Sequence, residues 1–267
     1  MFEILFLGTG TSHGVPTVDC MINDYKYCSK NVCRLAQNDK KHKRSRSSIL
    51  VSFNEKNVLI DCGPDFREQV LREKIKKIDA VLFTHRHSDH ICGVPDIRSY
   101  SGATGGKFLP VYGSPETIGA ISQSFSYIFD PNTFVGGGIP ELERNVIIKK
   151  VNLFEMEFVV IPVEHGSCKG CFGYRFGDIA YIPDVKSIPK DSINLLKNLE
   201  LLIIDCLRMK NVHSTHFIYD DVKNLIERIN PKKVLGTHLC HDIHYKTDEK
   251  VVDKRMKFAY DGLKITV

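Results

Sequence analysis

The feature that most constrains this chain is a short apolar run, Ala80-Val81-Leu82-Phe83, followed at once by Thr84-His85-Arg86-His87-Ser88-Asp89-His90. The run predicts a buried strand, so the histidines lie in the loop at its carboxyl end, where open α/β sheets place ligands. Side chains at i and i+2 of an extended segment point the same way, so His85 and His87 can bind one ion together. Asp89 and His90 follow as the chain turns and can face a second ion. Imidazole suits zinc, iron and manganese, and a carboxylate suits a harder ion, so the stretch predicts a metal site rather than a solvated polar loop.

Length and composition set the class of protein. With 267 residues, 42 % of them hydrophobic, the chain can form one large domain with two sheets or two small domains. The net charge of +5 is compatible with an anionic substrate and equally with ordinary variation. Nine cysteines do not resemble a secreted disulfide framework, and neither a signal peptide nor a run of about 18 apolar residues is present. We therefore expect a cytoplasmic protein with reduced thiols and no membrane partner.

The order of predicted elements indicates the architecture. Apolar runs predict strands near 2–7, 48–53, 58–61, 80–83, 108–112, 146–150, 158–163, 173–176, 179–182, 201–205, 234–236 and 263–267. Helical spacing and start signals predict helices near 64–73, 91–100, 114–127, 193–199, 217–229 and 248–256. Residues 15–47, 101–107 and 135–138 are expected to be irregular, and the basic run 40–46 to be solvated surface. Strands, then helices, then the same again predict two sheets packed together with helices outside, in one α/β domain over 1–267.

Three further residues stand at predicted strand ends. His165 follows the strand 158–163, Asp184 follows 179–182 and His238 follows 234–236. Each alone would more often be a structural residue. Together with the first stretch they supply five histidines and two aspartates, which is enough for two neighbouring ions with one bridging carboxylate.

The order His-x-His-x-Asp-His, followed by His, Asp and His at widening intervals, resembles the metallo-β-lactamase superfamily over nearly the whole chain. The resemblance implies an αββα sandwich of two mixed β-sheets flanked by helices. It also implies two divalent metal ions, zinc or manganese, in the active site. By this resemblance one ion is held by His85, His87 and His165. The other ion is held by Asp89, His90 and His238, and the bridging ligand is Asp184.

A narrower resemblance rests on Phe6–Pro16, Arg46-Ser47-Ser48 and Asp61–Arg67. These stretches are similar to a subgroup that contains the phosphodiesterase of the bacterial phosphonate-degradation pathway, which opens cyclic phosphodiesters. The subgroup is related more distantly to the tRNA 3′-end processing nucleases. The resemblance implies a phosphodiesterase that acts on small nucleotide-like or cyclic phosphodiesters through a metal-bridging hydroxide, with Asp89 and Asp184 in its catalytic site.

A leaving alkoxide needs a proton, and the subgroup places a general-acid histidine where His213 and His216 stand. We favour His216. Histidine suits the task because it titrates near neutral pH, and helix capping is the alternative for both residues. Ser12, in a Gly-Thr-Gly-Thr-Ser loop, is expected to contact substrate together with His213 and His216. The alternative for that loop is a plain turn. Asp61 either orients a ligand histidine or forms a strand-end turn.

The cysteines predict a second kind of metal site. The subgroup has a structural zinc, which implies Cys20, Cys28, Cys33 and His241 as ligands here, against free thiols in a loop. The interval from Cys20 to Cys28 is longer than in the subgroup, as if residues had been inserted. The pair Cys168-x2-Cys171 is interpreted as incidental. The remaining cysteines considered are expected to be small buried hydrophobes: Cys62, Cys92 and Cys206.

Other functions stay open on the same scaffold. One is hydrolysis of a thioester, lactone or amide, since the fold does not decide the substrate. A tRNA-processing nuclease is less favoured, because we identify no inserted RNA-gripping arm. A third class is non-hydrolytic: either a di-iron redox protein or a metal-dependent binding module. A redox role would normally need a flavin domain. The expected partner is a small phosphodiester or nucleotide-like substrate; a nucleic acid is less favoured, and a homodimer stays open.

Overall fold

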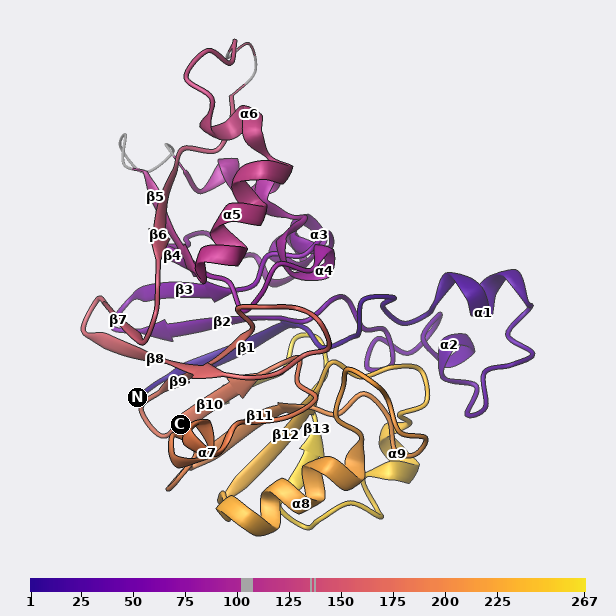
Figure 1. The fold of residues 1–267 in the computed structure, drawn as a ribbon. Helices are drawn as coiled ribbons and strands as arrows, with labels where there is room; N and C mark the ends of the chain where they lie inside the picture. The colour runs from indigo at the N-terminus through magenta and orange to yellow at the C-terminus, as the bar shows by residue number, and fades with distance from the viewer. Residues whose placement is uncertain (102–107, 135, 137) are drawn as a thin grey trace.

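The computed structural model describes residues 1–101, 108–134, 136 and 138–267. Two mixed sheets of seven strands each lie against one another, with helices on the outer faces (Figure 1). This architecture confirms the predicted αββα sandwich. The first sheet has the order β14 (Lys264–Thr266), β1 (Glu3–Gly8), β2 (Ser48–Phe53), β3 (Lys56–Ile60), β4 (Ala80–Leu82), β5 (Leu109–Gly113) and β6 (Leu142–Val146). The second has the order β13 (Met256–Phe258), β12 (Lys233–Thr237), β11 (Leu201–Asp205), β10 (Ile179–Ile182), β9 (Phe172–Phe176), β8 (Met156–Pro162) and β7 (Lys150–Leu153).

Both sheets combine antiparallel and parallel pairing. In the first, β14, β1, β2 and β3 pair antiparallel, whereas β3 to β6 pair parallel. In the second, β7 to β10 pair antiparallel and β10 to β13 pair parallel. The carboxyl ends of parallel strands meet at one edge of a sheet, which is where such folds collect functional loops.

Alternation along the strands distributes the core between three layers. Ile4 and Phe6 of β1 pack between the two sheets, whereas Leu5 and Leu7 face the helices outside the first sheet. Those helices are α3 (Phe66–Glu73), α4 (Ser88–Ile91), η1 (Val94–Ser99), α5 (Pro115–Ser124) and α6 (Ser126–Phe129). The outer face of the second sheet is covered by α7 (Lys190–Asn194), α8 (Tyr219–Ile229) and α9 (Tyr245–Asp248).

Helix α8 shows why the sequence folds as predicted here. Val222, Leu225, Ile226 and Ile229 recur at helical spacing, and all four are buried against the second sheet. Asp221 is the third residue of the helix, and its carboxylate accepts a hydrogen bond from the backbone N–H of the N-cap residue, Ile218, at 3.0 Å. The predicted helix 217–229 is therefore confirmed, with a start two residues later.

Several element predictions were wrong in detail. The segment 146–150 was predicted to be one strand, but it connects the two sheets. Strand β6 ends at Val146 at the edge of one sheet, and β7 begins at Lys150 in the other. The helix predicted near 248–256 is the short α9 followed by turns, in which the Asp253 carboxylate accepts from the Arg255 N–H at 2.9 Å. Residues 15–47 include α1 (Val18–Ile22) and α2 (Val32–Leu35). Residues 102–107, 135 and 137 of the predicted Gly-rich loops lie outside the described residues.

The basic run 40–46 is not solvated surface throughout. Arg44 is 1 % exposed, and its guanidinium donates to the carbonyls of Cys240 at 2.5 Å and Ile243 at 2.6 Å, and to the Tyr245 hydroxyl at 3.2 Å. His42 is also buried. The surface prediction was wrong because guanidinium can satisfy several buried carbonyls at once. Arg44 thereby fixes the segment that follows β12.

Within the described ranges, none of the helices is long and apolar enough to cross a membrane.

Candidate metal centre

Seven predicted ligands come together at the carboxyl-end loops of the two sheets. Their ligand atoms form overlapping groups in which every atom lies within 4.8 Å of the others. The loop after β4 supplies four of them, and the loops after β8, β10 and β12 supply one each. The set comprises His85, His87, Asp89, His90, His165, Asp184 and His238.

The first group contains three histidines. His85 Nε2 lies 2.9 Å from His87 Nδ1, and His165 Nε2 lies 3.3 Å from the same atom. The other ring nitrogen of His165 is 2.7 Å from the Thr215 carbonyl, so Nδ1 carries the proton and Nε2 is left as a lone pair. Three ring nitrogens facing one point are suited to one cation.

The second group contains one carboxylate and two histidines. Asp89 Oδ2 lies 3.3 Å from His90 Nε2 and 3.6 Å from His238 Nε2. Asp184 stands between the groups: its Oδ1 is 3.2 Å from His90 Nε2, and its Oδ2 is 3.5 Å from His165 Nε2 and 3.4 Å from His238 Nε2. One carboxylate thus reaches both groups of histidines, as a bridging ligand must.

The unpaired atoms of this cluster fit metal ions. Among the described residues, His90 Nε2, Asp184 Oδ1 and His238 Nε2 are buried without a hydrogen-bond partner, which costs free energy unless something else binds them. Burial lowers the pKa of His85 well below its usual value, which keeps the imidazole in the neutral form that binds metals. Burial opposes the charge on Asp184, but His238 and His90 outweigh it and hold the pKa of this carboxyl well below its usual value.

Asp61 holds one of the histidines in place. This fully buried carboxylate, at the end of β3, accepts from His90 Nδ1 at 2.8 Å. It also accepts from the backbone N–H and the hydroxyl of Thr84, each at 2.8 Å. The pattern favours the orienting role over the simple turn, because His90 must then direct Nε2 into the cluster.

Asp205 is a site residue that the sequence reasoning missed. It ends β11, is fully buried, and its Oδ2 accepts from His216 Nδ1 at 2.8 Å and from the Val185 N–H at 3.0 Å. The His216 ring stacks on His238 with centroids 4.7 Å apart. A ligand atom of His216 also lies within 4.8 Å of those of His165 and Asp184. His216 is therefore at the metal cluster, with its Nδ1 fixed by a carboxylate.

Burial shifts the pKa of both Asp205 and His216. Burial raises the pKa of Asp205 well above its usual value, and it lowers the pKa of His216. The signal that could have found Asp205 is its place at the end of an all-apolar parallel strand, the same signal that pointed to Asp184.

A cavity of about 600 Å³ opens onto the cluster. Ser12 and His213 both line it, as the sequence predicted for residues near substrate. His213 Nδ1 accepts from the Thr215 N–H at 3.3 Å, and its ring lies 5.1 Å from that of His216. Helix α8 has Ile218 as its N-cap, so neither histidine caps it. The cavity wall also includes Thr11, His13, Arg208, Thr215, His241 and Asp242.

The glycines of the first loop serve packing. A Cβ on Gly8 would collide with the carbonyl of Arg46, and one on Gly10 would press against the backbone of Arg44. Their close approach is to a neighbouring segment of the chain, which explains the glycines without an anion.

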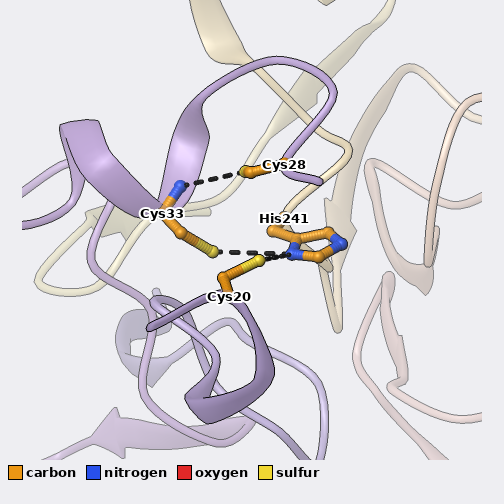
Figure 2. A group of neighbouring side chains, drawn as sticks. All are labelled: Cys20, Cys28, Cys33 and His241. Atoms are coloured by element: carbon orange, nitrogen blue, oxygen red, sulfur yellow. Dashed lines mark hydrogen bonds between the residues drawn. The ribbon is translucent and has the colours of Figure 1, made fainter. Parts of the chain in front are cut away.

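A second cluster lies where α1 and α2 meet the loop before α9, at one side of the sandwich (Figure 1). Figure 2 shows its four side chains pointing toward one another, Cys20, Cys28, Cys33 and His241. Cys20 Sγ is 3.1 Å and Cys33 Sγ 3.5 Å from His241 Nδ1. Cys28 Sγ accepts from the Cys33 N–H at 3.4 Å, so the long interval after Cys20 does not remove Cys28 from the group. Three sulfurs and one imidazole nitrogen are a donor set typical of structural zinc.

The remaining cysteines differ from one another. Cys62 and Cys206 are fully buried, as predicted, but Cys92 is exposed, so the prediction for it was wrong. Cys168 and Cys171 lie in the loop between β8 and β9, and Cys168 lines the cavity.

Comparison with known proteins agrees with this geometry. A model of the Beta-lactamase superfamily domain matches residues 56–239. The crystal structure of a new diphosphatase from the PhnP family superposes with a TM-score of 0.87 at 36 % identity, covering 100 % of this chain and 98 % of that one. The octanoyltransferase of Porphyromonas gingivalis is 31 % identical over 98 % of this chain and 51 % of its own length. The ribonuclease Z of Clostridium tetani is 30 % identical over 75 % of this chain and 55 % of its own.

The chain thus spans about half the length of the curated relatives it matches. The match to the family model and to a structure along its whole length nevertheless extends over both groups of histidines. The chain therefore belongs to the metallo-β-lactamase superfamily of metal-dependent hydrolases, and resembles its PhnP family in particular.

Proposed function

We propose that this protein is a dinuclear-metal phosphodiesterase that acts on small nucleotide-like or cyclic phosphodiesters. The observation that carries the proposal is the His216–Asp205 pair, 2.8 Å apart, beside a cluster of seven metal-ligating side chains. Such a pair can deliver a proton to an alkoxide leaving group, which phosphodiester cleavage needs. The similarity to a diphosphatase and to a ribonuclease Z also favours phosphate chemistry.

In this proposal each side chain has a defined task. His85, His87 and His165 hold one divalent ion, zinc or manganese. Asp89, His90 and His238 would hold the other, and Asp184 would contribute to both sites. When bound, two such ions activate a water molecule as the nucleophile and neutralise charge on phosphate oxygens. The cluster Cys20, Cys28, Cys33 and His241 holds a separate structural zinc.

The proton is handled by this chain's own residues. Asp205 accepts from His216 Nδ1, which fixes the ring, and His216 lines the cavity with Nε2 available for proton transfer. Protonated at Nε2, His216 donates to the departing oxygen, and Asp205 stabilises the charged imidazole before transfer. Ser12 and His213, on the cavity wall, contact the substrate.

The test is one panel of substrates with metal-replete protein. We expect turnover of alkyl and p-nitrophenyl phosphodiesters, and little of thioesters or lactones. His216→Ala should keep its metals and lose about 10²–10⁴ in rate on alkyl phosphodiesters. It should lose much less on p-nitrophenyl esters, whose leaving group needs no proton. His213→Ala, on the same cavity wall, is the matched variant and should not show this difference between leaving groups.

Two outcomes would contradict the proposal. Equal losses on both substrate types in His216→Ala would mean that this residue does not act as general acid. Turnover of thioesters or lactones without any phosphodiester turnover would place the protein in another hydrolase class.

A tRNA 3′-end is a second candidate substrate, favoured by the ribonuclease Z relatives at 30 % identity. Precursor tRNA belongs in the same panel. Cleavage of precursor tRNA at a higher kcat/KM than any small phosphodiester would favour this candidate.

A further inference from the structure

Two thiols lie in the loop that carries the metal-cluster histidine His165. The sequence Cys168-Lys169-Gly170-Cys171 forms a turn between β8 and β9. The Cys168 N–H donates to the His165 carbonyl at 3.1 Å, and the Cys171 carbonyl accepts from the Val163 N–H at 3.1 Å. Directly after the turn, the Phe172 N–H donates to the Thr84 carbonyl at 2.9 Å. The turn is therefore hydrogen-bonded to the His165 loop and to Thr84, which directly precedes His85.

The two cysteines lie on one short turn, three residues apart in the chain. The Cys171 thiol donates to the Cys168 carbonyl at 3.4 Å, which brings its sulfur against the backbone of the other cysteine. Gly170 keeps the turn tight: its φ is +70°, and a Cβ there would collide with Ser114 and Glu116. Two cysteines held on one tight turn satisfy the short span that a disulfide requires.

The pair is also placed for stepwise oxidation. Cys168 lines the cavity, as His87 does, so a small solute that enters the site meets this residue. Both cysteines are largely buried, at 9 % exposure for Cys168 and 4 % for Cys171, but Cys171 does not line the cavity. A cavity-lining cysteine with a second cysteine behind it is the arrangement that peroxide-sensing pairs use. Cys62 and Cys206, by contrast, are fully buried.

We propose that Cys168 and Cys171 are a reversible redox modification site, oxidised to a disulfide by a hydroperoxide, and that this disulfide lowers turnover at the metal cluster. The Cys168 sulfur attacks the terminal peroxide oxygen, becomes a sulfenic acid and releases water or an alcohol. The Cys171 sulfur then attacks the Cys168 sulfur and a second water leaves. In total, two thiols lose two electrons and two protons, and the peroxide is reduced.

The effect on the site follows from the contraction of the pair. An S–S bond of about 2.05 Å repositions the Cys168 side chain in the cavity wall and distorts the turn that is bonded to the His165 carbonyl. A misplacement of about 1 Å can cost about 10²-fold in rate. We expect a partial effect, about a tenfold loss of kcat, because the histidines themselves stay in place. The disulfide does not depend on the proposed function, whereas the loss of turnover rests on it.

Lys169 makes the disulfide directly measurable. Trypsin cleaves after Lys169, between the two cysteines, so the resulting peptides stay linked only if the disulfide is present. Metal-replete protein is treated with graded hydrogen peroxide, digested under non-reducing conditions and analysed by mass spectrometry. We expect the linked peptides to form before Cys92 is oxidised, although Cys92 is the exposed thiol. A phosphine reductant should separate them again and restore turnover.

Cys171→Ser is the decisive variant and Cys92→Ser its matched control, each compared with its own untreated activity. Cys171→Ser should resist the peroxide-dependent inhibition, and Cys92→Ser should behave as wild type. Absence of linked peptides in wild type when Cys92 is oxidised would overturn the site, with or without phosphodiester activity. Linked peptides without loss of turnover, or inhibition that persists in Cys171→Ser, would overturn the regulatory effect. Absence of phosphodiester turnover in untreated protein would instead contradict the proposed function.

Discussion

Asp205→Asn is the substitution that most sharply separates a catalytic His216 from a structural one. The change keeps the shape of the side chain and removes its charge. In the native protein the carboxylate oxygen Oδ2 accepts from His216 Nδ1 at 2.8 Å and from two backbone N–H groups, those of Val185 at 3.0 Å and Phe217 at 3.4 Å. An amide oxygen can still accept from the backbone, but it no longer carries the charge that stabilises a protonated imidazole.

The expected loss of kcat follows from the hydrogen bond between Asp205 and His216, which loses its charged acceptor in Asp205→Asn. A hydrogen bond to a charged group contributes about 1.5–3 kcal/mol. If the whole of it acts in the transition state, its loss lowers kcat about 10–150-fold, at about 1.4 kcal/mol for each factor of ten. The loss should be concentrated on substrates with alkoxide leaving groups, because only they draw on the proton of His216.

The assay compares kcat for an alkyl and a p-nitrophenyl phosphodiester, with metal content measured on the same samples. The control is Asp178→Asn, an exposed carboxylate that pairs only with Arg175 among the described residues. Asp205 Oδ1 also lies 4.0 Å from His238 Nδ1, so metal content must be shown to stay constant. Equal losses on both substrates, or a loss that tracks missing metal, would refute the assignment of Asp205 as the partner of a general acid.

Two other substitutions and one alkylation experiment test separate parts of the account. Asp184→Ala should lose more metal and more activity than His87→Ala, because the Asp184 carboxylate reaches both groups of histidines; near-native metal content would refute the bridge. Arg44→Lys should lower the free energy of unfolding in urea by about 1–3 kcal/mol, since an ammonium leaves a buried carbonyl unpaired; a change under about 0.5 kcal/mol, as at surface positions, would contradict this. Cys33 should resist alkylation in folded protein and react once a strong chelator removes the structural zinc; free reaction at the outset would exclude that zinc.

The sequence was most informative where a local pattern of residue types indicates one structure or one ligand chemistry. Apolar runs followed by His or Asp predicted ligand side chains at the carboxyl ends of strands, and those side chains do lie together in the structure. The strand alternation of Ile4 to Leu7 likewise corresponds to two different layers of the core. Periodicity and ligand chemistry are local properties, so they could be recognised without the fold.

What the sequence could not predict depended on distant neighbours. Arg44 was assigned to the surface because its run is basic, and only the fold brings the carbonyls of Cys240 and Ile243 to its guanidinium. Asp205 ended a strand like other ligands, but its use depends on His216, which arrives from a separate loop. The strand predicted at 146–150 was wrong because the same apolar residues mark the passage from one sheet to the other.

The most direct test of the central claim is a count of metal ions by elemental analysis, before and after mild chelation and reloading. Seven converging ligands and a separate set of three cysteines and one histidine predict three ions in each chain. Two should be exchangeable and should return with activity on phosphodiesters, while one zinc stays through chelation. A reloaded protein that holds one exchangeable ion or none would contradict the dinuclear centre.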